Sequence, residues 1–152
     1  MSIDLQQREV EGITILALRG RLVAGSAIDT LRDAIAVVAG GKSEQEDGQD
    51  HARNVILNLK HVTYIDSSGL GALIYSRTTI TNTGGDLRLL KLSKRSAQLL
   101  ILTKLTTVFQ IFDNEEAAVN SFFAGREVKP FDILEFVKSQ EEEEDDAESK
   151  PA

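Results

Sequence analysis

The chain has 152 residues, and its 41% hydrophobic and 27% charged residues are typical of one globular domain with a real core. It contains no cysteine, which excludes disulfides and thiolate metal sites. Residues 141–152 account for −6 of the formal net charge of −7, and neither they nor the nearly neutral remainder offers the basic stripe that nucleic acid binding needs.

The first half of the chain alternates apolar runs with turn residues. The elements expected there are a strand over 3–8, a turn at Glu11-Gly12, a strand over 13–19, a helix over 27–39 capped by Ser26 with Ile28, Leu31, Ile35 and Val38 on its apolar stripe, and a strand over 54–59. Residues 40–53 between the last two are polar and rich in glycine and acids, which predicts a mobile loop insertion.

The second half continues the alternation. The expected elements are a helix to about residue 83 ended by Gly84-Gly85, a strand over 86–90, a helix from a Ser93 cap to residue 105, a strand over 108–112, and a helix from an Asn114 cap to residue 123. Helix-length connections between short apolar strands predict an α/β fold with a mostly parallel sheet, an N-terminal antiparallel strand and flanking helices.

The turn at residues 66–71, Asp-Ser-Ser-Gly-Leu-Gly, follows a strand-like run and opens a helix. Ser67 or Ser68 can cap that helix, and the Asp66 carboxylate lies beside the positive end of its dipole. Gly69 and Gly71 let another surface approach the backbone closely. The pattern fits an anion site and equally an ordinary capped helix start.

Two enzymatic interpretations of this turn lack supporting residues. A serine nucleophile needs a base, and the chain has only His51, in the predicted loop, and His61. A dinucleotide-binding turn would need glycine where Ile74 stands, and the segment around Lys42 lacks the first glycine of a phosphate-binding loop. We therefore expect no enzymatic activity, no cofactor and no metal site.

The helix after the turn has an apolar stripe of Leu70, Leu73, Ile74 and Ile80. Arg77 falls inside the stripe, so either its stem packs while its head reaches water, or it pairs with a buried acid. Ala72 and Tyr75 point away from the stripe, which places them on an exposed surface beside the serines.

Residues 54–71 resemble the signature of the STAS domain, and above all that of the bacterial anti-sigma factor antagonists. The resemblance covers about residues 3–124 and includes Gly20-x-Leu22, Gly84-Gly85 and Asp113. It implies a small α/β binding domain, here residues 1–124. Residues 125–152 form an extension with no counterpart in the family.

The resemblance implies a function and a site. Such a protein captures an anti-sigma factor that is often a serine kinase, which phosphorylates the second serine of the motif, while a serine phosphatase reverses the reaction. That position is Ser68, with Ser67 as the alternative. The implied partner-binding residues are Asp66, Ser67, Ser68, Gly69, Leu70, Gly71, Ala72 and Tyr75. Many family members carry an acid after Gly-x-Leu, where this chain has Val23.

Other functions stay open beside this one. A STAS subunit of a signalling or lipid-transport complex would use the serine structurally, and a small nucleotide- or acyl-handling enzyme is a remote alternative. A homodimer is also possible. No apolar run reaches about 18 residues and the N-terminus has no signal pattern, so we expect a cytoplasmic protein without membrane insertion.

The extension carries five large apolar residues within residues 131–137, ahead of an acidic run. Phe131, Leu134 and Val137 recur at helical spacing, with Ile133 and Phe136 alongside, and Pro130 suits a first helical turn. The short amphipathic helix either packs on its own domain or docks into a partner or a second copy.

Overall fold

The computed structural model describes residues 3–40 and 52–138. The predicted loop over 40–53 lies mostly outside the described residues, as does the acidic run. In the described part of the chain, no helix is long and apolar enough to cross a bilayer.

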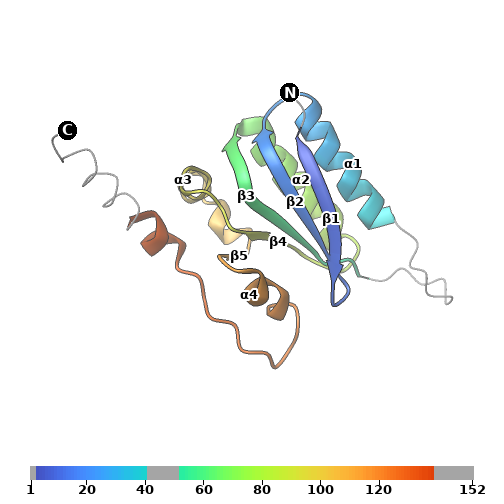
Figure 1. Cartoon of the computed structure of the whole chain (residues 1–152), viewed down its shortest axis with the longest axis vertical. Coiled ribbons are helices and arrows are strands. Elements are labelled where there is room, and N and C mark those ends of the chain that lie inside the picture. Colours follow the sequence, from blue (N-terminus) through green and yellow to red (C-terminus); the bar gives the residue numbers. More distant parts are fainter. Residues whose placement is uncertain (1–2, 41–51, 139–152) are drawn as a thin grey trace.

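The chain alternates strands and helices as predicted (Figure 1). The elements are β1 (Asp4–Val10), β2 (Ile13–Leu22), α1 (Ser26–Gly40), β3 (Val55–Ile65), α2 (Ser67–Thr81), β4 (Leu87–Leu90), α3 (Lys94–Leu102), a 3-10 turn (Leu105–Thr107), β5 (Ile111–Phe112) and α4 (Glu115–Asn120). Residues 133–138 form a last helical turn.

The five strands form one sheet in the order β1-β2-β3-β4-β5. β1 pairs antiparallel with β2 through the turn at Glu11-Gly12, where both residues have positive φ angles of 50° and 84°. Two consecutive positive φ angles are the conformation that matches the twist of a two-residue hairpin. All other neighbours are parallel, so the predicted fold class is confirmed.

Hydrophobic side chains are buried on both faces of the sheet, which is why the central strands read as continuous apolar runs. The larger core lies under α1, α2 and α3, and contains Leu16, Leu57 and Leu89. The smaller core lies under α4 and contains Ile15 and Ile56.

The carboxyl edge of the sheet is stepped. β3 pairs with β4 only as far as Asn58, opposite Leu90, and then continues to Ile65 alongside β2. β4 and β5 therefore end well before β3 does, and β2 and β3 together carry the chain to the start of α2.

Several predicted boundaries differ from the structure. Ser26 is the first residue of α1 and not a flanking cap, α3 ends at Leu102, and α4 ends at Asn120. Only residues 111–112 of the strand predicted over 108–112 pair with β4. Ser93 and Asn114 cap their helices as predicted, accepting from the backbone N–H groups of Ser96 and Ala117.

Candidate docking and phosphorylation site

The turn at residues 66–71 lies where β2 and β3 end at the carboxyl edge of the sheet. Ile65, the last residue of β3, is paired with Leu22, the last residue of β2. The Asp66 N–H then donates to the Leu22 carbonyl at 3.3 Å, and α2 begins at the next residue. The parallel register thus brings the loop after β2 beside the first turn of α2.

Asp66 caps α2, so the prediction that Ser67 or Ser68 would do so is wrong. Asp66 has an extended backbone, and its Oδ1 accepts from the Gly69 N–H at 2.8 Å. Its Oδ2 accepts from the Ala24 N–H at 3.0 Å. Asp caps helices as well as Ser does, and here the aspartate comes first in the chain.

The two backbone hydrogen bonds stabilise the ionised form of Asp66 relative to its protonated form. The N–H of Ala24, followed by that of Gly69, lowers the pKa of Asp66 below its ordinary value of 3.8. Asp66 therefore holds a full negative charge at neutral pH and joins the first turn of α2 to the loop between β2 and α1.

Ser67 and Ser68 are the first two residues of α2, and both are exposed. Within residues 3–40 and 52–138, neither hydroxyl makes a hydrogen bond, and neither approaches His61 closely enough for one. These serines are therefore chemically available, but the described residues do not present them as activated nucleophiles.

The two glycines of the turn have different roles. Gly69 is buried, and a Cβ there would lie 2.1 Å from the Leu22 carbonyl oxygen and 2.8 Å from Ile65 Cγ2. Gly71 is exposed, and a Cβ there would meet nothing within 4 Å. Gly69 thus lets α2 pack against the end of β2, whereas Gly71 leaves backbone open at the surface.

The prediction that Ala72 is exposed is wrong, because this residue is 3% exposed and belongs to the core under α2. Leu70 is half-buried against the same core. Tyr75 is 45% exposed, as predicted, and Ile74 is 41% exposed although the pattern placed it on the buried stripe. We call the exposed group Ser67, Ser68, Gly71, Ile74 and Tyr75 the docking surface.

Two arginines flank this region and were missed by the sequence analysis. The Arg32 guanidinium, from α1, lies 4.3 Å from the centre of the Tyr75 ring. The Arg21 guanidinium lies 5.1 Å from the ring of Tyr64, its partner in the β2–β3 register. Both arginines come from elements distant in the sequence, so no local pattern could have identified them. Stacked guanidinium groups give the surface cationic and aromatic character together.

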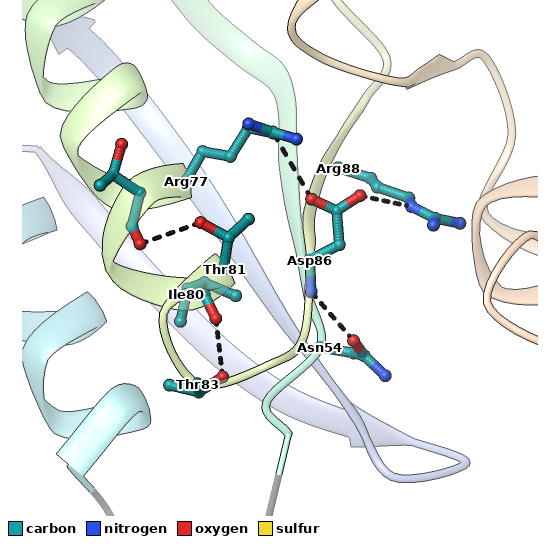
Figure 2. A network of polar contacts seen from close by, with 8 residues as sticks. Asn54, Arg77, Ile80, Thr81, Thr83, Asp86 and Arg88 are labelled. Atoms are coloured by element: carbon teal, nitrogen blue, oxygen red, sulfur yellow. Dashed lines mark hydrogen bonds and ion pairs between the residues drawn. The ribbon is translucent and has the colours of Figure 1, made fainter.

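A polar network anchors the other end of α2 (Figure 2). Arg77 Nε lies 3.4 Å from Asp86 Oδ1, and Arg88 Nε lies 3.1 Å from Asp86 Oδ2. Arg88 also donates to the Ser121 hydroxyl at 2.6 Å and lies 4.0 Å from the centre of the Phe122 ring. Of the two alternatives for Arg77, the structure therefore shows the ion pair, and the network joins α2 to the end of α4.

Known proteins resemble this chain across the same region. Residues 4–118 match the family model described as STAS domain. The anti-sigma F factor antagonist of Paenibacillus polymyxa is 24% identical over 119 residues, which cover 78% of this chain and 94% of the relative. The anti-sigma-B factor antagonist of Bacillus subtilis is 29% identical over 119 residues, which cover 78% of this chain and 99% of the relative.

A solved structure shows the same fold. The Bacillus cell fate determinant SpoIIAA in its phosphorylated form is 18% identical, with a TM-score of 0.56 over 78% of this chain and 98% of that chain. The family model covers far more than half of the present sequence. This chain belongs to the STAS domain family.

Proposed function

We propose that this protein is an anti-sigma factor antagonist whose docking surface binds an anti-sigma factor. The main support is that an exposed pair of serines opens α2 in a domain whose relatives are named as such antagonists. The surface combines an exposed aromatic ring, an exposed aliphatic side chain and open backbone, which are features of binding sites. The protein acts by binding, in the cytoplasm, and any catalysis belongs to its partners.

We further propose that Ser68 is phosphorylated by the anti-sigma factor acting as a serine kinase, with Ser67 as the alternative acceptor, and that a serine phosphatase restores binding. A phosphate adds about 1.5–2 negative charges at neutral pH. On Ser68 this charge would lie close to the Asp66 carboxylate, which already occupies the Gly69 N–H. Desolvating both charges without a cationic partner would cost several kcal/mol, enough to abolish an ordinary interface.

The acceptor assignment is tested by phosphopeptide mapping. The protein is incubated with the anti-sigma kinase that co-purifies with it, beside the variants Ser68→Ala and Ser67→Ala. We expect phosphate on the wild type and on Ser67→Ala, and none on Ser68→Ala. Phosphate at Ser67 of the Ser68→Ala variant would make Ser67 the acceptor in place of Ser68. Phosphate at any other residue of that variant would refute the site.

The partner assignment is tested by affinity capture from the native cell with mass spectrometry. An anti-sigma factor among the captured proteins supports the antagonist, with or without a homodimer. Capture of a transport or signalling assembly without any anti-sigma factor would instead favour a scaffold subunit with a structural serine.

A further inference from the structure

We propose that the cavity between the middle of β3, the carboxyl ends of β4 and β5 and the C-terminal segment, residues 125–138, binds a small carboxylate with an apolar tail. The cavity has a volume of about 240 Å³. It lies at the step that the short strands β4 and β5 leave beside the longer β3.

The C-terminal segment contacts the rest of the domain at two places and forms a wall of the cavity. Arg126 makes paired hydrogen bonds with the Glu11 carboxylate at 3.0 and 3.1 Å and stacks on Phe123 at 4.0 Å. Further along, Ile133 and Phe136 pack against the larger core, and Val137 is part of it. Figure 1 shows the segment leaving α4 and passing the β5 side of the sheet.

The walls of the cavity are apolar. Phe131 and Phe136 from the C-terminal segment form one side, with their ring centres 5.5 Å apart and an interplanar angle of 59°. Leu92 and Phe112 from the strand ends form the other side. The volume is somewhat below the roughly 300–1,000 Å³ of pockets for drug-sized molecules, so a ligand here is small.

Two lysines among the lining residues favour an anionic ligand. Lys60 and Lys91 both line it, and within the described part of the chain neither pairs with a carboxylate. Asp113 is the acid among the lining residues, and its Oδ1 accepts from the Asn114 side chain. The positive charge therefore exceeds the negative charge around an apolar space, which matches a carboxylate head on a hydrocarbon or aromatic body.

The backbone of Lys91 supports a binding role. Lys91 has a φ of 58°, in the left-handed region that a residue with a side chain rarely adopts, while its N–H donates to the Phe112 carbonyl at 2.8 Å. Such conformations concentrate at ligand sites. Here the unusual conformation turns the chain at the end of β4, where Lys91 and Leu92 line the cavity.

In the test, octanoate is titrated into the full chain as the probe. Binding is monitored by the chemical shifts of the backbone amides in NMR spectra. We expect saturable shifts at residues 91, 112, 131 and 136, with a Kd of about 0.1–1 mM. Octylammonium, which has the same tail and the opposite charge, is expected to give no saturable shifts there. Equal binding of both probes, shifts confined to other residues, or no shifts up to about 10 mM octanoate would overturn the proposal.

A variant pair tests the lysines. The double variant Lys60→Gln, Lys91→Gln should bind octanoate about five-fold or more weakly, because charge-assisted contacts are lost. The control is Lys104→Gln, since Lys104 has a similar φ of 62° and does not line the cavity. Matching thermal melts establish that the variants are folded. An unchanged Kd in the folded double variant, or an equal loss in the control, would refute the role of the two lysines.

Discussion

Gly69 and Gly71 provide a matched pair of substitutions in one helix. Gly69→Ala should lower the free energy of unfolding by about 2 kcal/mol or more, because the new methyl group overlaps the Leu22 carbonyl and the backbone must move. Gly71→Ala meets open space, so it should be neutral or stabilise by up to about 1 kcal/mol. Urea unfolding of the two variants checks this, and equal effects would contradict the different roles of the glycines.

Asp66 gives a prediction with a defined pH dependence. Its pKa in the folded protein lies below the ordinary 3.8, so its carboxylate stabilises the fold fully above that pH and loses this effect as the pH falls through the lower folded value. In the variant Asp66→Asn, the new amide cannot titrate and offers one oxygen to the N–H groups of Ala24 and Gly69. The wild type should therefore have the higher urea midpoint at pH 7, and its advantage over the variant should shrink below about pH 3.8. A difference in urea midpoint between the two proteins that stays the same at every pH would contradict this account.

At the residue scale, the sequence identified the turn but not every role within it. Asp66, Ser67 and Ser68 are all capping residue types, and only the backbone dihedral angles decide which of them precedes the helix. The exposure of Ala72 and Ile74 differs from prediction because α2 packs against both the sheet and α1. The side of α2 that these contacts bury does not fully coincide with the side that carries its largest apolar residues. The stacked Arg21 and Arg32 depend on tertiary contacts.

At the scale of elements, Asp86 connects α2, β4 and α4. Asp86→Ala would leave Arg77 and Arg88 without their shared carboxylate, and these two side chains are only 34% and 13% exposed. We expect a loss of about 1–3 kcal/mol in the free energy of unfolding. Glu127→Ala removes an exposed acid for comparison and should change stability by less than about 0.5 kcal/mol. If Asp86→Ala loses no more free energy of unfolding than Glu127→Ala does, the network contributes little to stability.

The last helical turn offers a second comparison. Val137 is 8% exposed and lies in the larger core, whereas Leu134 on the same turn is 63% exposed. Val137→Ala should destabilise the protein by about 1–3 kcal/mol, and Leu134→Ala by less than about 0.5 kcal/mol. Thermal melts check both values. A neutral Val137→Ala would show that the C-terminal segment does not stabilise the domain.

The sequence predicted the elements better than it predicted their ends. Parallel strands buried on both faces read as uninterrupted apolar runs, so β2, β3 and β4 were recognisable. The shortness of β5 and the early end of α3 depend on where neighbouring strands and the 3-10 turn lie. The amphipathic pattern after Pro130 predicted a helix. Whether this helix packs on its own domain or docks into a partner or a second copy could be decided only from the three-dimensional structure.

At the scale of the whole molecule, the two proposed sites use the same edge of the sheet in different ways. The docking surface follows the long strands β2 and β3, whereas the cavity lies beyond the short strands β4 and β5. The residues matched by the STAS family model end at 118, so Phe131 and Phe136 of the cavity lie outside them. Binding of a partner and binding of a carboxylate are therefore separable by substitutions at different residues.

The most direct test of the central claim compares capture of the anti-sigma factor by the wild type and by Ser68→Asp, with thermal melts of both proteins. The substitution would place a charge on the docking surface near Asp66 while the helix dipole still favours an acid at this position. We predict loss of the captured anti-sigma factor with a melting temperature close to that of the wild type. Undiminished capture by Ser68→Asp would contradict control of docking at this serine, and a collapsed melting temperature would show that the residue serves the fold instead.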